Sequence, residues 1–359
     1  MTNKGKAYLR NLLVLLPLVL LVLLLHGAYD TLKEVPNLRR ALTADYDILY
    51  FGDSVVESWG ACDTDAETID RKLAARLAGR DGGRVLAMTH GAYSPRVYAR
   101  LVDLLALAAH RPRFVIVPLN PRSFSAQWID QPLYTFPATL ALLDLLAGRD
   151  VAANLVTYLD ARYADLVARR TAAWKDRRIV YDGYDLGVRR DFDDRVVGAL
   201  LDQPQFECKP GAEAPFADVL RDLYVYHYMN TVTAGHPMFA FLRRFHARAR
   251  ALGMTPLYYI TPVNLEEGER RVGPAFRARV TANLRVMGAE LEALGASWLD
   301  MSFDLPAARF VDRKWVAEHL DARGRAHVAN RLANRLAELL AAPTEARGAA
   351  GPGAGKRLD

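Results

Sequence analysis

The sequence predicts an α/β protein with a parallel sheet of about five strands flanked by helices. Short apolar segments rich in β-favouring residues alternate along the chain with longer segments whose apolar residues recur at helical spacing. Each short segment ends in a cluster containing Gly, Asn or Ser, so the loops that bind ligands in such folds fall on one edge of the sheet. With 359 residues, the chain is long enough to bury a large core.

The first strand is the most informative one. Apolar residues from Ile48 to Phe51 stop abruptly at Gly52-Asp53-Ser54, which is typical of a buried strand that enters a tight turn. A serine at the carboxyl end of such a strand lies where open α/β sheets bind their ligands. The other predicted strands are residues 84–88, 113–119, 256–260 and 296–301.

Helices are predicted between these strands. Thr64 and Glu67 have the spacing of a capping box and predict the start of a helix with Ile69, Leu73 and Leu77 on one face. Further helices are predicted after residue 95, over 238–252 and 276–294, and from Asp321 to about residue 341. Residues 124–235 are less regular and predict a largely helical insertion, which could cover the site.

The N-terminus has the pattern of a membrane segment. Residues 12–25 are an apolar run interrupted only by one proline, and a generous count, 11–28, is near the lower limit of about 17–25 residues for a spanning helix. Three basic residues within 1–10 favour a cytoplasmic N-terminus. A cleaved signal peptide is the alternative, but residues 26–28 (His-Gly-Ala) have histidine at the −3 position of the cleavage site, where a small residue is wanted. We therefore expect an uncleaved, single-pass signal anchor in the cell membrane, with the following domain outside the cytoplasm.

The remaining chain is divided into three parts. Residues 29–46 are predicted to be a linker with some helical character, 47–341 the catalytic domain, and 342–359 a disordered tail. The formal charge of +6 is modest, and no basic run is interleaved with aromatic residues, so we expect no nucleic-acid partner. Cys62 and Cys208 lack metal-site spacing and are either one disulfide or two thiols.

Four residues at strand ends and loops have the chemistry of acyl transfer. Ser54 is a candidate nucleophile, and His319, just ahead of the last helix, is the candidate base that such a serine needs. Gly91 follows the second strand and Asn120 the third, where a backbone N–H and a side-chain amide can hold an oxyanion. Each of these residues also has an ordinary reading as a turn or surface residue.

In this order the motifs resemble the SGNH/GDSL hydrolase superfamily. Gly-Asp-Ser after the first strand, Gly after the second, Asn after the third and His-Leu before the last helix match it over roughly residues 47–340. The resemblance implies a flavodoxin-like, three-layer fold without a cofactor or a metal. It also implies that Ser54 is the nucleophile, that Gly91 and Asn120 are oxyanion donors, and that His319 is the base.

Two positions depart from the pattern of that superfamily. Its usual acid lies three residues before the histidine, where this chain has Val316. Asp312, seven residues before, and the adjacent Glu318 are the candidates to orient the imidazole, and some related enzymes use a backbone carbonyl instead. The usual Asn-Asp pair is replaced by Asn-Pro-Arg, and Arg122 either binds an anionic substrate group or pairs with a carboxylate of the insertion.

Within the superfamily, the membrane anchor and the large insertion look most like the DltD and AlgJ/AlgX group. Residues 258–264 are similar to the fourth-strand segment of DltD-like proteins. The resemblance implies a role in acylating a cell-envelope polysaccharide or polymer beside a membrane-bound O-acyltransferase. The sequence therefore predicts a serine esterase or O-acyltransferase. The alternative is an inactive module of the same fold that binds or assembles an envelope polymer.

Overall fold

The computed structural model describes residues 34–59, 63, 65–163, 166–181, 183–202, 217–312 and 315–341. The expected membrane segment, both cysteines and the expected disordered tail lie outside these residues. Within the described part of the chain, no helix is both long enough and apolar enough to cross a membrane.

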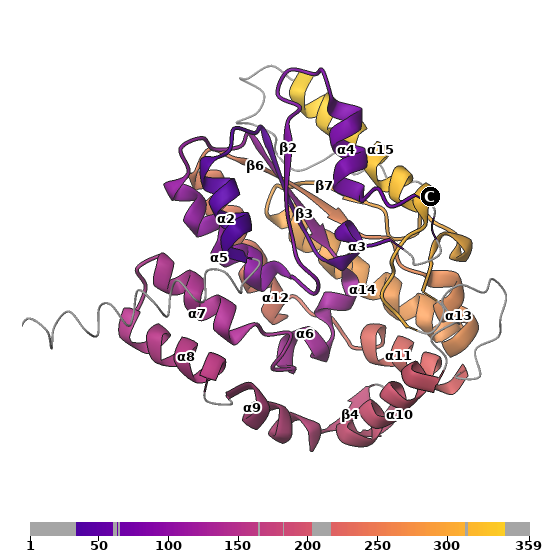
Figure 1. Ribbon diagram of the computed structural model, residues 1–359. Coiled ribbons are helices and arrows are strands. Elements are labelled where there is room, and N and C mark those ends of the chain that lie inside the picture. Colours follow the sequence, from indigo (N-terminus) through magenta and orange to yellow (C-terminus); the bar gives the residue numbers. More distant parts are fainter. Residues whose placement is uncertain are drawn as a thin grey trace, which may run out of the picture.

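A five-stranded parallel sheet forms the centre of the molecule (Figure 1). The strand order is β2-β1-β3-β6-β7, and every pairing is parallel. This is the order of flavodoxin-like folds, in which successive strands are added first on one side of β1 and then, from β3 on, on the other side. The predicted sheet is confirmed. Its strands are β1 (Ile48–Gly52), β2 (Val85–Thr89), β3 (Phe114–Leu119), β6 (Thr255–Ile260) and β7 (Ser297–Asp300).

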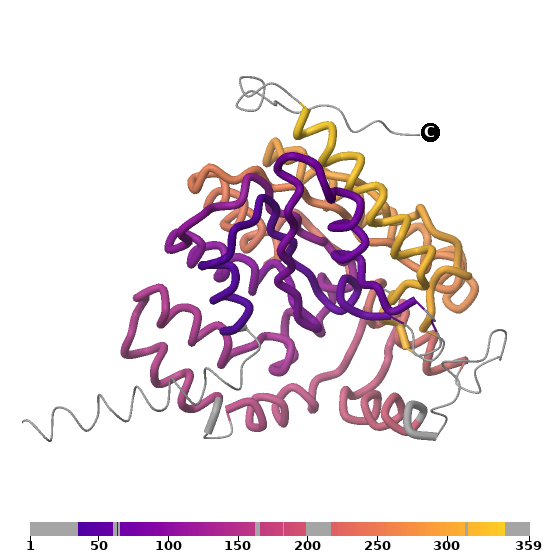
Figure 2. Tube along the Cα trace, turned by 45° about the horizontal axis from the view of Figure 1, so that its top comes forward, coloured from indigo at the N-terminus to yellow at the C-terminus, as the bar shows by residue number. Residues whose placement is uncertain are grey.

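Helices cover both faces of the sheet. Alternate residues of a strand point to opposite faces, so Tyr50 belongs to the core under one layer and Phe51 to the core under the other. Helices α4 (Ile69–Leu77) and α15 (Ala322–Ala341) pack side by side on the first face (Figure 2). The second face is covered by α5 (Pro95–Leu104), α12 (Pro237–Ala251) and α14 (Pro274–Ala293).

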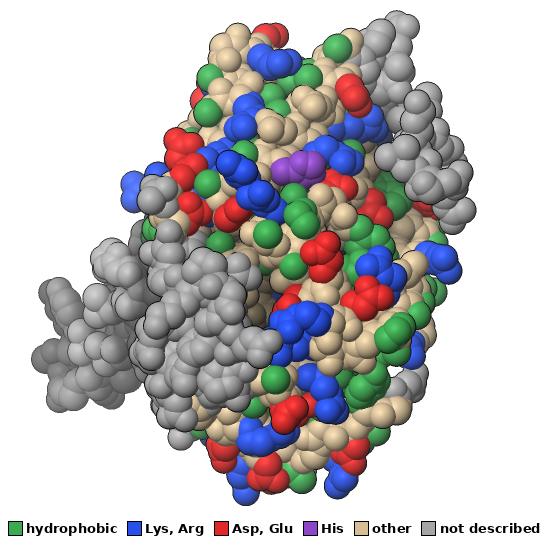
Figure 3. Space-filling model, turned by 90° about the vertical axis from the view of Figure 1, so that its right-hand side faces the viewer, with side chains coloured by type: hydrophobic (Ala, Val, Ile, Leu, Met, Phe, Trp, Pro, Cys, Tyr) green, Lys and Arg blue, Asp and Glu red, His purple; other side chains and the backbone are tan. Residues whose placement is uncertain are grey.

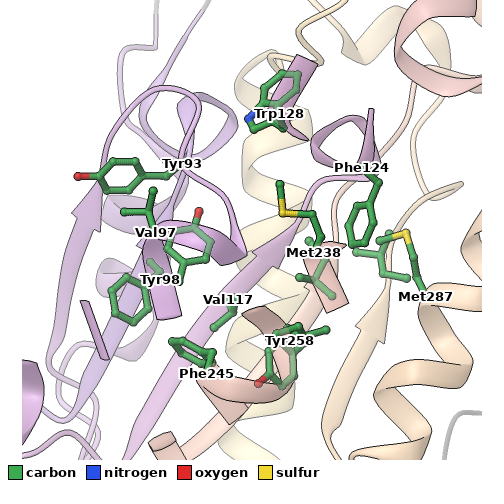
Figure 4. Packing of buried hydrophobic residues seen from close by; sticks show 14 of the residues in the cluster. Tyr93, Val97, Tyr98, Val117, Phe124, Trp128, Met238, Phe245, Tyr258 and Met287 are labelled. Carbon is green, nitrogen blue, oxygen red and sulfur yellow. The ribbon is translucent and has the colours of Figure 1, made fainter. Parts of the chain in front are cut away.

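Aromatic packing holds the second layer against the sheet (Figure 4). The Phe51 ring lies 5.3 Å from that of Tyr98 on α5 and 5.7 Å from that of Phe245 on α12. Tyr258 of β6 contacts Phe245 edge-on. These rings are fully buried, and aromatic pairs of this kind add about 0.5–1.5 kcal/mol each beyond their buried area. The carboxyl ends of the strands are thereby fixed relative to each other.

The expected linker is in part a helix of the domain. Residues Glu34–Thr43 form α2, whose Leu38 and Ala41 are buried in the core. The Asn37 amide donates to the carbonyl of Thr89, the last residue of β2, at 3.5 Å. The chain then reaches the opposite edge, where the Asp47 carbonyl accepts from the start of β3. Helix α2 therefore runs antiparallel to the strands of the sheet and begins at the edge where the strands end.

The predicted capping box at Thr64 and Glu67 is wrong about where the helix begins. Helix α4 starts at Ile69, and Thr64 is outside the described residues. Asp65 Oδ1 accepts the Glu67 N–H at 2.8 Å, a local turn that competes with helix formation. The buried Arg325 of α15 also binds the Glu67 carbonyl at 2.8 Å and holds this segment extended.

The segment between β3 and α12 is mostly helical and curves below the sheet in Figure 1. It also contains an antiparallel pair of strands that the sequence pattern did not separate from its helices. Trp128 fixes it to the site edge, because its indole N–H donates to the Ala92 carbonyl at 3.0 Å. Its elements are η2 (Pro121–Phe124), α6 (Ala126–Asp130), α7 (Pro137–Leu146), α8 (Val151–Tyr163), α9 (Leu166–Lys175), β4 (Arg178–Tyr181), β5 (Tyr184–Val188), α10 (Arg189–Asp202) and α11 (Ala217–Tyr228).

Short elements complete the fold at its loops. They are α3 (Ser54–Glu57), η1 (Leu105–Leu107), α13 (Leu265–Val272) and η4 (Ala307–Arg309). On the face shown in Figure 3, basic and acidic side chains are interspersed rather than gathered by sign. That surface has no single-sign field of the kind that attracts a polyanion.

Candidate active site

Gly52 lets the end of β1 come close to its neighbours. A Cβ atom at this position would lie 2.7 Å from Thr89 Cγ2 and 2.8 Å from Val56 Cβ, which is closer than real side chains approach. Only glycine therefore allows the chain to turn here between β2 and α3. Asp53 and Ser54 follow at the reversal point between β1 and β3, where open α/β sheets bind ligands.

Asp53 fixes the turn that carries Ser54. Its Oδ1 accepts the Val55 N–H at 2.9 Å and caps α3, while its Oδ2 accepts from the Asn120 amide at 3.3 Å. Burial raises the pKa of Asp53 and outweighs the opposing effects of Arg122 and these two hydrogen bonds. Ser54 is half-buried and is the first residue of α3. Its N–H therefore lies at a helix start, where backbone donors have no partner inside the helix.

His319 is held by Asp312 through two hydrogen bonds. The imidazole Nδ1 lies 3.2 Å from Asp312 Oδ1, and the His319 main-chain N–H donates to Oδ2 at 2.8 Å. Because a carboxylate only accepts, Nδ1 carries the hydrogen, and in the neutral ring Nε2 therefore carries the lone pair. Nε2 is buried and has no hydrogen-bond partner among the described residues. Burial lowers the pKa of His319, but the bond and the charge of Asp312 outweigh it and the pKa is raised.

The loop of residues 310–320 closes on itself and brings Asp312 beside His319. Phe310 and Leu320 form an antiparallel bridge, and the Val311 N–H donates to the His319 carbonyl at 2.9 Å. A residue seven positions before the histidine is therefore beside it. Val316, which occupies the usual acid position, is a buried apolar side chain. Asp312, and not Glu318 or a backbone carbonyl, is the residue that contacts the imidazole Nδ1 among the described residues.

Asn120 is placed beside the Ser54 turn, as the sequence predicts. It is buried, and its Oδ1 accepts the Arg122 N–H at 3.0 Å. One hydrogen of its amide is donated to Asp53. An amide nitrogen carries two hydrogens, so the second is available to an oxyanion. The role of Asn120 as an oxyanion donor stays a prediction.

Gly91 follows β2 next to the same turn, and its neighbours in the structure leave room for a side chain. The left-handed residue of this loop is Ala92, with φ 65°. A Cβ atom on Gly91 would meet only Glu57 Oε1, at an ordinary contact distance of 3.8 Å. The Gly91 N–H remains a predicted oxyanion donor. The neighbouring His90 stacks on Tyr93 with ring centroids 4.9 Å apart.

Arg122 and Glu318 were both candidates in the sequence, but their contact with each other was not predicted. Arg122 is buried, donates through Nη1 to the Val316 carbonyl, and lies 4.9 Å above the Trp128 ring. Its Nε is 3.8 Å from Glu318 Oε2. Among the described residues, Arg122 thus pairs with the loop that carries His319 and not with a carboxylate of the insertion. Its position directly after a buried strand was the signal that could have found it.

Comparisons with known proteins give little more. No family model matches the chain, and no curated protein matches it. Among solved structures, Axe2, an acetylxylan esterase from Geobacillus stearothermophilus, is similar over 82% of this chain and 96% of that chain, with 12% identity and a TM-score of 0.39. A catalytic mutant of Axe2 aligns over the same shares with 12% identity and a TM-score of 0.40. These values are too low to establish a family.

Proposed function

We propose that this protein is a serine esterase or O-acyltransferase that forms an acyl-Ser54 intermediate. His319 Nε2 takes the proton of Ser54 Oγ while that oxygen forms a bond to the acyl carbonyl carbon. The imidazolium then gives its proton to the leaving alcohol as the ester bond breaks. Water or an acceptor hydroxyl attacks the acyl-enzyme by the same steps in reverse. The Ser54 and Gly91 N–H groups and the Asn120 amide are the proposed donors to the oxyanion.

The observation that carries this proposal is the state of His319. One ring nitrogen is bound to a carboxylate, and the other is buried with no hydrogen-bond partner in the described part of the chain. That is the arrangement a general base needs, because the carboxylate fixes the tautomer and later stabilises the imidazolium. The missing acid at Val316 had favoured an inactive module. The contact with Asp312 supplies the acid from another position and so supports the enzyme.

The proposed substrate is an acyl ester of a cell-envelope polysaccharide or polymer. Support comes from the motif resemblance and from the insertion, whose Trp128 and Phe136 contact residues at the site edge. An insertion over the site limits water and favours transfer to a hydroxyl over hydrolysis. A membrane-bound O-acyltransferase is the proposed partner.

The proposed location is the outer side of the cell membrane, with residues 11–28 as a single-pass anchor. Support comes from the apolar run in the sequence and from the direction of α2. The first turn of α2 packs against α7 and α8 through Val35. The chain therefore enters the domain at the same sheet edge as Ser54.

The test is reaction of the full chain, in detergent, with an activated serine-directed phosphonate. Intact-mass spectrometry should find one adduct on the wild type and none on Ser54→Ala. Ser58→Ala is the matched control, because Ser58 follows the same short helix, and it should keep the adduct. A folded wild type without an adduct would contradict the proposed function and favour a polymer-binding module.

A further inference from the structure

Glu318 is a buried acid that occupies a costly position. Its side chain is almost fully buried, and neither carboxyl oxygen has a hydrogen-bond partner among the described residues. Its backbone is left-handed, with φ 57°, a conformation that non-glycine residues seldom adopt. Such strain persists only where the surroundings impose it, and it gathers at functional sites. Glu318 is also the residue directly before His319.

Arg122 imposes this position from the end of β3. Its Nε faces Glu318 Oε2 at 3.8 Å, and its Nη1 binds the Val316 carbonyl two residues earlier in the same loop. Its main-chain N–H is held by Asn120, and its guanidinium lies over Trp128. One arginine therefore connects β3, the insertion and the loop of His319. The left-handed turn directs the Glu318 carboxyl inward to this cation.

Four ionisable groups face the Glu318 carboxyl from the elements around it. They are Arg122 of η2, Asp53 at the end of β1, His319 of the same loop and Tyr224 of α11. Burial raises the pKa of Glu318 to about 7, because the effects of Arg122 and His319, which lower it, are smaller than the desolvation. A single guanidinium thus faces two buried carboxyl groups, so one of them gains a proton near neutral pH.

We propose that Glu318 is a positioning residue for His319 whose ionised form, paired with Arg122, stabilises the imidazolium that forms when His319 takes the Ser54 proton. The role of Glu318 in catalysis rests on the proposed function. The coupling between the protonation of Glu318 and that of His319 does not, since it is a property of the resting protein. The coupling is reciprocal. If the imidazolium of His319 favours proton loss from Glu318, then the ionised Glu318 favours the imidazolium of His319 to the same extent.

The test follows the ring nitrogens of His319 by NMR through the pH range. The sample is the full chain in detergent with ¹⁵N-labelled histidine, and His319→Gln identifies the signal. Coupled groups titrate in macroscopic steps that belong to the pair. We expect two pKa values to be required to fit the titration of the wild-type His319 signal, one of them close to that of Glu318. In Glu318→Gln one pKa should be enough, and the pKa of His319 should fall by about half to one pH unit.

Two further variants make the result specific to Glu318. Glu318→Asp keeps a carboxylate and should keep the second step. Glu57→Gln removes a half-buried carboxyl near Gly91 and should also keep the second step. A single step in the wild type overturns the inference, and so does a second step that survives in Glu318→Gln or disappears in Glu57→Gln.

A single wild-type step overturns the inference even if Glu318→Gln does not fold. The titration involves no reaction at Ser54. A missing phosphonate adduct with two titration steps would therefore contradict the proposed function and leave the coupling of Glu318 to His319 in place.

Discussion

Two histidine–aspartate pairs lie in the C-terminal part of the chain, and they use opposite ring nitrogens. His319 binds Asp312 through Nδ1 and keeps Nε2 without a partner. His327 binds Asp304 through Nε2 at 2.9 Å, and Arg331 binds the same carboxylate oxygen at 2.7 Å. The far nitrogen of His327, the one that can reach furthest from the backbone, is therefore occupied. Contact with an acid does not by itself make a histidine a general base. The histidine must also keep Nε2 available to take a proton.

The two pairs also differ in their surroundings. The His327 side chain is 37% exposed and the His319 side chain 23%, with its Nε2 fully covered. Water and salt screen the charges of an exposed pair, so the pair contributes little to stability. In a covered pair the charge of the aspartate acts strongly on the protonation of the histidine. We therefore expect His327 to tolerate changes that His319 does not.

The largest difference should appear when each histidine is removed. His319→Ala should slow the phosphonate reaction of Ser54 by about 10³-fold or more, because the base is lost. His327→Ala should react at nearly the wild-type rate. Time-resolved intact-mass spectrometry measures both rates under one condition. Equal losses in the two variants would mean that His319 has no special role.

Changing the two acids should give a smaller contrast. Asp312→Asn should slow the reaction by about 10²-fold, because the imidazole loses its orientation and its counter-charge. It should also move the pH midpoint of the reaction downward, since the bond and charge of Asp312 are what raise the pKa of His319. Asp304→Asn serves as the control, and a wild-type midpoint and rate are expected for it. An unchanged midpoint in Asp312→Asn would remove Asp312 from the site.

The smallest effect concerns stability near Glu318. Its pKa is about 7 in the folded protein and 4.5 ordinarily, so the folded state holds an extra proton between these values. Its contribution to stability is present below pH 4.5 and is lost as the pH rises toward 7. Glu318→Gln does not titrate, so its free energy of unfolding should gain about 3 kcal/mol on the wild type across this window.

Thermal unfolding at the two ends of that pH range measures this gain. Glu338→Gln is the control, because Glu338 is exposed and should show no pH-dependent difference from the wild type. A Glu318→Gln variant that tracks the wild type at both pH values would show that the Glu318 carboxyl does not titrate in this window.

The sequence was most informative where local pattern decides the structure. The strand 48–52 and the turn at Ser54 were predictable because apolar residues must be buried and Gly52 must be small. The contact of Asp312 with His319 was left open, because it depends on the loop closing between Phe310 and Leu320.

The pairing of Arg122 with Glu318 was not predictable from sequence. It joins residues almost two hundred positions apart through a buried contact that no spacing rule encodes. The start of α4 was missed for a related reason, because Arg325 from the last helix holds Glu67 outside the helix.

The direction of α2 would limit how far the Ser54 of the proposed enzyme lies from the membrane. If residues 11–28 span the bilayer, the arm between them and Glu34 has five residues and reaches at most about 18 Å. Since α2 begins at the carboxyl edge of the sheet, that short arm keeps Ser54 near the lipid head groups. An acyl group still attached to a lipid or to a membrane protein could then be handed over within the plane of the membrane, while a polymer acceptor would have to come down to the surface to receive it.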